Sequence, residues 1–234
     1  MKILALLTGR GGSKLKNKNI LKINGKPCLY YPCKASKSIK SIKYFFVSSD
    51  DINILKTAEK YGFKKIKRPK KLSRDNSQHI DVLKHALKVF RSKENFLPDY
   101  VLVLLANAPI INSRWIRDCL KIIQKNKEIT SVVPVYEDND HNPLRAKKIH
   151  KKYIKNFLNH KGNISSNRQE LPRSYFLCHN FWIIKSSSIF KNNGEKPWSF
   201  MGKKIKPYIV NKTIDIHDYS DVILANYILK KKTK

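Results

Sequence analysis

A glycine-rich, basic loop near the amino terminus is the first segment whose residues could do chemistry. It reads Gly9-Arg10-Gly11-Gly12-Ser13-Lys14, and Lys16, Lys18 and Asn19 follow it. Glycines let backbone amides approach an anion closely, and the cations can pair with phosphate oxygens. The spacing is neither that of a P-loop, GxxxxGK[ST], nor that of a GxGxxG fingerprint. The loop therefore predicts a triphosphate site of another kind, and the alternative is a solvated turn in a lysine-rich chain.

The elements that would position this loop predict an α/β fold. The apolar run from Ile3 to Leu7 indicates a buried strand that ends at the loop, the place where open α/β sheets bind phosphates. Further strands are expected at 44–48, 63–67, 100–105, 130–135 and 175–184. Helices are expected at 27–38, 52–61, 78–90, 113–124 and 218–230. Strands that alternate with helices indicate a mostly parallel, Rossmann-like sheet flanked by helices, with right-handed crossovers.

Length and composition favour a single domain. A chain of 234 residues with 41% hydrophobic content can bury one sizeable core, so we expect one domain over residues 1–234. The stretch at about 141–172 is polar and irregular, and we expect it to form a small inserted lobe used in dimer contacts. The chain has no signal-peptide pattern and no run of about 18 apolar residues that could span a bilayer. We therefore expect a cytoplasmic protein with no membrane partner.

The formal net charge of +32 has two explanations. Lysine is spread along nearly every expected helix and loop, asparagine and isoleucine are abundant, and no nucleic-acid-binding motif accompanies the charge. This pattern favours compositional bias together with anionic substrates, and a nucleic-acid partner is the less favoured alternative.

The four cysteines lack metal-ligand spacing and indicate reduced thiols. His79 and His85 lie six residues apart on the 78–90 helix, so we interpret them as surface or core filler.

Several short motifs follow the glycine-rich loop in a recognisable order. They are Lys18-Asn19-Ile20, Asn24-Gly25-Lys26-Pro27, Val47-Ser48-Ser49-Asp50, Arg68-Pro69, His141-Asn142-Pro143-Leu144 and Arg168-Gln169-Glu170-Leu171-Pro172. Together with the loop, they resemble the acylneuraminate cytidylyltransferase family, which includes the CMP-sialic acid, CMP-pseudaminate, CMP-legionaminate and CMP-Kdo synthetases. The resemblance covers nearly the whole chain, which makes it more specific than any one motif.

The resemblance implies a role for each matching residue. Arg10, Lys14 and Lys18 would hold the triphosphate, and Arg10 and Lys18 would also be catalytic. The implied nucleotide contacts are Gly11, Gly12, Ser13, Lys14, Asn19 and Arg68. The implied substrate contacts are Asn107, His141, Arg168 and Gln169. Arg168, with His141 or Lys147 nearby, could pair with a sugar carboxylate.

The chain departs from the family at the sugar side and at the metal. Residues 104–109 are shorter than the family's LLQPTSP motif and lack its glutamine, and residues 178–182 replace its NGAIY motif. The family carries Asp-Ile-Asp facing one Mg²⁺, whereas this chain has Asp215-Ile216-His217. Asp215 with phosphate oxygens could still hold Mg²⁺, which prefers oxygen ligands and keeps several waters. His217 could serve as a general base, and the alternative is an ordinary edge residue beside Asp218, which would cap the last helix.

These observations predict a cytidylyltransferase. It would transfer CMP from CTP to the anomeric hydroxyl of an acidic 2-keto sugar of the nonulosonate kind, release pyrophosphate, require Mg²⁺ and form a homodimer. One alternative is a nucleotidyltransferase for another sugar. The other is a catalytically degenerate paralogue that only binds nucleotide.

Overall fold

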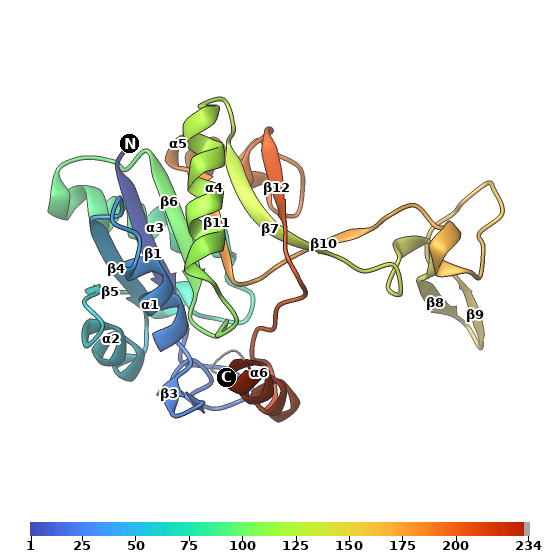
Figure 1. Ribbon diagram of the computed structural model, residues 1–234, viewed down its shortest axis with the longest axis horizontal. Helices are drawn as coiled ribbons and strands as arrows, with labels where there is room; N and C mark the ends of the chain where they lie inside the picture. The colour runs from blue at the N-terminus through green and yellow to red at the C-terminus, as the bar shows by residue number, and fades with distance from the viewer. Residues whose placement is uncertain (232–234) are drawn as a thin grey trace.

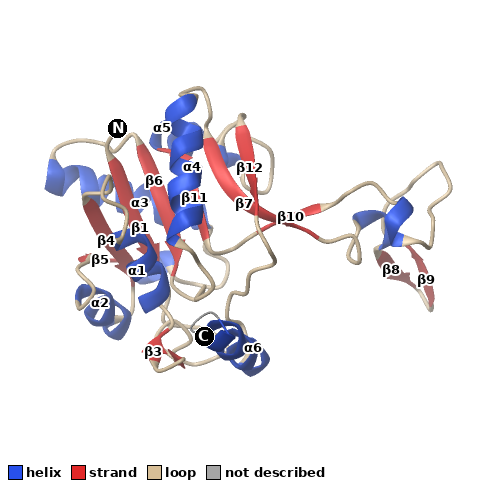
Figure 2. Ribbon diagram, in the orientation of Figure 1, coloured by secondary structure: helices blue, strands red, loops and turns tan. Residues whose placement is uncertain are grey.

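The computed structural model describes residues 1–231, and a sheet of eight strands forms its centre (Figures 1 and 2). The strands are β1 (Ile3–Thr8), β4 (Tyr44–Ser49), β5 (Lys64–Lys67), β6 (Tyr100–Leu105), β7 (Ser131–Glu137), β10 (Tyr175–Leu177), β11 (Phe181–Lys185) and β12 (Ile205–Ile209). Their order is β10-β7-β11-β6-β1-β4-β5, and β12 also pairs with β7. The predicted α/β fold with a mostly parallel sheet is confirmed.

The parallel half of the sheet brings four loops to one edge. β1 pairs in parallel with both β4 and β6, and β5 pairs in parallel with β4. β1 and β6 are apolar and almost wholly buried, as expected of strands that are covered on both faces. Because the carboxyl ends of parallel strands meet at the same edge, the loops at 9–19, 50–51, 68–78 and 106–112 lie together.

The other half of the sheet is mixed. β11 lies antiparallel to β6 and β7, β10 lies antiparallel to β7, and β12 runs parallel to β7. The prediction of one continuous strand at 175–184 is wrong. From Leu177 to Ile183 the chain advances six residues while the paired residue on β7 moves only from Val135 to Val132, so a bulge interrupts the ladder between Cys178, whose N–H still donates to the carbonyl oxygen of Pro134 at 2.9 Å, and Ile183. β12 was not predicted, because it is mostly exposed and contains a proline.

Helices cover both faces of the sheet. They are α1 (Tyr30–Lys37), α2 (Ile52–Glu59), α3 (His79–Glu94), α4 (Ser113–Lys125) and α5 (Ser186–Lys191), whereas α6 (Tyr219–Lys231) packs beyond the edge of the sheet. Residues of α1, α2 and α4 share one apolar core with the sheet, and residues of α3 and α5 share the core on the other face. The first helix begins at Tyr30 rather than at Pro27. No helix within residues 1–231 is long and apolar enough to cross a membrane.

A third, smaller core lies below the edge where the parallel strands end. The hairpin of β2 (Lys22–Ile23) and β3 (Lys26–Pro27) packs with α6 around Ile23, Ile216 and Ala225. The last helix therefore rests against the segment that follows the glycine-rich loop, although about 200 residues separate them in sequence. Asn226 on α6 accepts a hydrogen bond from the backbone N–H of Asn24, with an N···O distance of 2.7 Å.

An arm projects from the end of the sheet that carries β7 and β10 (Figure 1). It includes the antiparallel hairpin of β8 (Lys147–His150) and β9 (Tyr153–Asn156), whose residues are all exposed. Two single-turn helices, η2 (Pro143–Arg145) and η3 (Arg168–Glu170), lie at its base. The arm contains the stretch 141–172, which we expected to form a small inserted lobe.

Candidate active site

The glycine-rich loop is packed tightly against its neighbours in two places. A side-chain Cβ at Gly9 would lie 2.9 Å from Cβ of Ala106, and one at Gly11 would lie 2.7 Å from Oδ2 of Asp51. Close approach, rather than an unusual backbone angle, therefore favours glycine at both positions. Gly12 has no neighbour within 4 Å of such a Cβ, so the middle of the loop faces open space.

Hydrogen bonds to side chains fix the shape of this loop. The buried amide of Asn19 donates to the carbonyl oxygen of Arg10 at 2.9 Å. The backbone N–H of Gly11 donates to Oδ1 of Asp50, the residue that follows β4, at 3.1 Å. Asn19, which we predicted as a nucleotide contact, thus supports the loop from within the fold.

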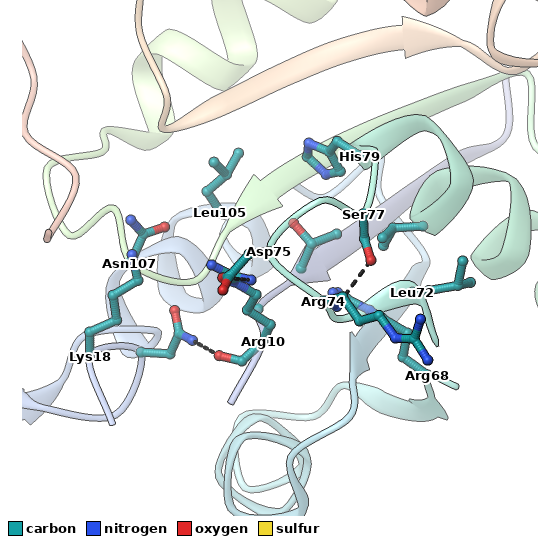
Figure 3. A pocket seen from close by; sticks show the side chains of 14 residues that line it. Arg10, Lys18, Arg68, Leu72, Arg74, Asp75, Ser77, His79, Leu105 and Asn107 are labelled. Carbon is teal, nitrogen blue, oxygen red and sulfur yellow. Dashed lines mark hydrogen bonds and ion pairs between the residues drawn. The ribbon is translucent and has the colours of Figure 1, made fainter. Parts of the chain in front are cut away.

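Two adjoining cavities open at this edge of the sheet. The inner cavity has a volume of about 250 Å³, and its lining includes Thr8, Arg10, Lys18, Asn19, Arg68, Asp75, Ser77, His79, Leu105 and Asn107 (Figure 3). The outer cavity has a volume of about 990 Å³, and its lining includes Arg10, Gly12, Ser13, Lys14, Lys18, Arg74, Asp75, His217, Asp218 and Tyr219. Arg10, Lys18, Arg74 and Asp75 line both. The structure therefore brings the predicted phosphate loop and the segment around His217 to one place.

Arg10 and Lys18 project into both cavities. Arg10 forms an ion pair with Asp75, with an Nη1···Oδ1 distance of 2.6 Å, across the gap between the glycine-rich loop and the 68–78 loop. Asp75 is 94% exposed, so this ion pair contributes little to stability and an incoming phosphate can compete for the guanidinium. Burial lowers the pKa of Lys18, and the carboxylate of Asp215 opposes that shift. Lys18 therefore lies close enough to Asp215 to interact with it electrostatically.

Arg68 forms the buried wall of the inner cavity. Its guanidinium donates to the carbonyl oxygen of Ser48 at 2.7 Å and to the Ser48 hydroxyl at 3.2 Å. Burial lowers the pKa of Arg68 to about 10, with a smaller contribution from Arg10, while Asp50 opposes the shift. The side chain therefore stays positively charged at neutral pH and adds a fixed cation behind the loop.

Asn107 joins the end of β6 to the segment at 215–217. Its backbone carbonyl accepts from the N–H of Ile216 at 2.8 Å, and its side-chain amide donates to the Ile216 carbonyl at 3.2 Å. This reciprocal pair fixes the residues on either side of Ile216, which are Asp215 and His217. Asn107 was predicted as a substrate contact, and it lines the inner cavity while holding this segment in place.

Asp215 and His217 form a close pair. The distance from Oδ2 of Asp215 to Nε2 of His217 is 2.6 Å, and the imidazole is 67% exposed. The carboxylate of Asp221 accepts from the backbone N–H of His217 at 2.8 Å. Asp218 accepts from the N–H groups of Ser220 and Asp221 and so caps α6, as one of the alternatives for this segment predicted.

The residues of this segment fit a magnesium ion that takes part of its ligands from the bound substrate. Within residues 1–231, no group of three or more His, Cys, Asp or Glu residues could hold a metal by itself. Mg²⁺ is commonly bound by one or two carboxylates together with substrate phosphates. Asp215 has one carboxylate oxygen, Oδ1, to which no described residue donates, and it lies near Lys18 of the phosphate loop.

The other predicted substrate contacts, Arg168, Gln169 and His141, lie elsewhere, at the base of the arm. Arg168 and Gln169 line a separate cavity of about 660 Å³. Nη1 of Arg168 is 2.8 and 2.7 Å from the two carboxylate oxygens of Asp140. His141 is paired with Asp138, with an Nδ1···Oδ2 distance of 2.9 Å. None of these residues lines the inner or outer cavity within one chain.

Sequence reasoning did not identify some residues of the two cavities. Arg74 lines both cavities, and its position on an irregular loop gave no signal apart from its charge. His79 was interpreted as filler, but it lines the inner cavity. Its place at the start of α3, at the carboxyl edge of the sheet, was the signal that could have identified it.

Comparisons with known proteins show the family of the chain. A family model described as cytidylyltransferase matches residues 4–182. Post-translational flagellin modification protein B of Campylobacter coli is 29% identical over 98% of this chain and 96% of that protein. Pseudaminic acid cytidylyltransferase of Campylobacter jejuni is 32% identical over 58% of this chain and 60% of that protein.

Solved structures share the fold. The structure of CMP:2-keto-3-deoxy-manno-octonic acid synthetase complexed with CTP superimposes with a TM-score of 0.72, covering 99% of this chain and all of that one at 15% identity. The family match spans β1 to the start of β11, and so includes the glycine-rich loop and the inner cavity. The chain belongs to the cytidylyltransferase family and is a nucleotidyltransferase.

Proposed function

We propose that the protein transfers CMP from CTP to the anomeric hydroxyl of an acidic 2-keto sugar of the nonulosonate kind and releases pyrophosphate. One observation carries the proposal: the glycine-rich loop with Arg10 and Lys18 shares the outer cavity with His217, and Lys18 lies close enough to Asp215 to interact with it electrostatically. The first group provides cations for a triphosphate, and the second provides a carboxylate and an imidazole for the reacting end. Relatives named for CMP transfer to sugar acids support the choice of nucleotide and acceptor class.

In this reaction the chain's main tasks are positioning and charge neutralisation. Arg10, Lys14 and Lys18 would bind phosphate oxygens, with the open backbone around Gly12 as the place of approach. Arg68 adds a fixed positive charge behind them. The acceptor hydroxyl attacks the α-phosphorus, the bond from that phosphorus to the bridging oxygen breaks, and pyrophosphate leaves with that oxygen. The leaving group gains negative charge, which these cations stabilise.

Asp215 is the residue that would hold Mg²⁺, together with phosphate oxygens of the substrate. The ion, when bound, supplies additional neutralisation of phosphate charge. His217 would accept the proton of the attacking hydroxyl. Its Nε2 faces Asp215, which orients the ring and leaves Nδ1 for the proton, in the way that a carboxylate orients a histidine in other enzymes.

The acceptor would occupy the outer cavity. That cavity is about four times as large as the inner one, and Lys14, Arg74 and Tyr219 lie in its wall beside His217. A sugar carboxylate could pair there with Lys14 or Arg74. Arg168, Gln169 and His141 stay candidates for acceptor binding, although they lie at the base of the arm.

We further propose a homodimer that forms through the arm. Large apolar side chains on the arm are exposed without cover from their own chain: Ile149 is 82% exposed, Tyr153 and Ile154 are each 71% exposed, and Phe157 is 59% exposed. Such a cluster is typical of an interaction surface. Light scattering should give twice the monomer mass, and replacing Ile149 and Ile154 by serine should give the monomer mass.

A substrate panel tests the proposed reaction. Purified protein with Mg²⁺ is incubated with each of CTP, UTP, GTP and ATP and with a set of 2-keto sugar acids, and pyrophosphate release is measured. We expect release with CTP and a nonulosonic acid only. CTP binding without pyrophosphate release for any acid would contradict the proposal and favour a nucleotide-binding paralogue. Because CTP is a cytoplasmic metabolite, we place the reaction in the cytoplasm.

A further inference from the structure

Asn107 lies in the loop that follows β6, lines the inner cavity, and is 9% exposed (Figure 3). Its side-chain amide nitrogen donates to the carbonyl oxygen of Ile216 at 3.2 Å, across 109 residues of sequence. Its backbone carbonyl oxygen accepts from the N–H of Ile216 at 2.8 Å. One residue therefore holds both backbone polar groups of Ile216, which lies between Asp215 and His217.

The segment around Ile216 has no regular secondary structure of its own. Residues 210–218, all of them described by the structure, form neither helix nor strand. Asp215 and His217 therefore lack the hydrogen-bond ladder that positions side chains on a strand or helix. Ile216 is 0% exposed and belongs to the same apolar cluster as Ile110, three residues after Asn107. The position of the segment thus depends on contacts between Ile216 and this loop.

The side-chain bond of Asn107 fixes the peptide group between Ile216 and His217. That group is planar, so its carbonyl oxygen and its N–H turn together. Asn107 holds the oxygen, and the carboxylate of Asp221 accepts from the N–H of His217 at 2.8 Å. The plane sets the direction in which the His217 side chain leaves the backbone, and Nε2 of its ring lies 2.6 Å from Oδ2 of Asp215. A peptide group held at both polar atoms therefore keeps the imidazole against the carboxylate.

The partner of the Asn107 amide also fixes which way the amide points. The Ile216 carbonyl oxygen can only accept, so the amide presents its nitrogen and not its oxygen to it. Removing the amide would leave the carbonyl oxygen of a buried residue without this donor, which is costly. The peptide group would then turn toward another donor and carry His217 with it.

We propose that Asn107 is a positioning residue for the reaction: through the Ile216 carbonyl, it holds His217 against Asp215 in the orientation that accepts the proton of the attacking hydroxyl. The inference rests on the proposed function and deepens it. A direct substrate contact and a positioning residue have different kinetic effects. Loss of a contact weakens substrate binding, whereas loss of positioning lowers turnover while binding stays intact.

Steady-state kinetics and CTP affinity separate these two roles. In Asn107→Ala we expect kcat to fall about 10-fold, with CTP affinity by calorimetry and the KM of the acceptor within about twofold of wild type. Asn107→Ser, whose hydroxyl can donate to the same carbonyl, should lose less. A raised KM with an unchanged kcat would make Asn107 a substrate contact and overturn the proposal.

Asn112→Ala is the matched control from the same loop. The Asn112 side chain caps α4 by accepting from the N–H of Arg114 at 2.8 Å. Its loss should lower thermal stability, as loss of a helix cap does, and leave kcat unchanged. An equal fall of kcat in Asn112→Ala and Asn107→Ala would mean that the loop matters only for stability, which contradicts the positioning role.

A double-mutant cycle tests whether Asn107 acts through His217. If Asn107 orients the imidazole, the loss of about 10-fold should shrink to about twofold in the His217→Ala background, where there is no ring to orient. The same loss in both backgrounds would contradict the proposal. If Asn107→Ala does not fold, Asn107→Ser takes its place in the cycle.

NMR signals of the His217 imidazole nitrogens, recorded without substrate and assigned by comparison with His217→Ala, give a readout that does not depend on turnover. We expect them to shift in Asn107→Ala and to keep their wild-type positions in Asn112→Ala. Unchanged His217 signals in Asn107→Ala would overturn the proposal. The proposed function fails separately: a wild type that never releases pyrophosphate contradicts the reaction, while the NMR comparison still reports whether Asn107 orients His217.

Discussion

Arginines in the two predicted binding regions have opposite surroundings. Arg68 is buried at the end of β5, held by Ser48, and faces a cavity shared with Arg10 and Lys18. Arg168 lies at the base of the arm, is 53% exposed, and is paired with Asp140. The sheet positions the first arginine whether or not a ligand is bound. The second lies on an excursion of the chain, and the carboxylate of Asp140 takes the place that an anionic ligand would occupy.

Loss of the Asp215 carboxylate, which lies beside the cavities at the sheet edge and not on the arm, should have the largest effect on turnover. Asp215→Asn removes the charge that would hold Mg²⁺, and we expect turnover to fall about 1,000-fold. Turnover should fall less in His217→Ala, because the proposed metal ligand Asp215 remains. Pyrophosphate release at saturating CTP, with and without a chelator, measures both variants. Wild-type turnover in Asp215→Asn would mean that the reacting end lies elsewhere.

Arg10→Ala should have the next largest effect. The guanidinium lines both cavities and its partner Asp75 is exposed, so we expect about a 100-fold loss of kcat/KM with almost no loss of stability. Arg117→Ala, on an exposed position of α4, is the matched control. Steady-state kinetics and thermal unfolding separate the two effects, and a variant with normal turnover would remove the triphosphate assignment.

Arg168→Ala tests whether the acceptor binds at the arm or at the cavities beside the sheet. If Arg168 binds the sugar carboxylate, its loss should raise the KM for the acid about 10-fold and leave CTP affinity unchanged. Asp140→Ala should lower that KM, because it frees the guanidinium from its partner at 2.7 Å. An unchanged KM in both variants would remove Arg168 from the site and leave acceptor binding to the outer cavity.

The smallest effect concerns stability at acid pH. Desolvation raises the pKa of Asp138, but hydrogen bonds from His141 and Lys212 outweigh it and lower that pKa to about 2. Because the folded state holds the Asp138 proton less tightly than the unfolded state does, the contacts of Asp138 with His141 and Lys212 stabilise the fold above about pH 4. This stabilisation is lost as the pH falls toward 2. We expect about 1 kcal/mol, measured as the difference in unfolding free energy between wild type and Asp138→Asn at pH 5 and pH 2.5. An equal pH dependence in both proteins would contradict this role.

The body of the fold was more predictable than the arm for physical reasons. An apolar strand such as 3–8 that ends in glycines and cations is a local pattern, and the rule for parallel sheets places its loop at the binding edge. The break between β10 and β11 depends on contacts with β6 and β7 that are distant in sequence. β12 is mostly exposed and has no apolar alternation to reveal it.

The site residues also differed in how far the sequence could predict them. Arg10, Lys14 and Lys18 lie in one short segment, and the structure places all three at the two cavities. His79 is chemically ordinary in sequence, and only the cavity around it distinguishes it from His85. Arg168 and His141 matched a family motif, but a motif does not specify which surface an arm presents to the site.

Product analysis with labelled nucleotide tests the central claim most directly. CTP that carries a radioactive α-phosphorus is incubated with the protein, Mg²⁺ and a nonulosonic acid, and the products are separated. We predict that the label appears in a CMP-sugar and that unlabelled pyrophosphate is released in equal amount. Label that stays in CTP, or that appears only as free CMP, would contradict transfer to a sugar at this site.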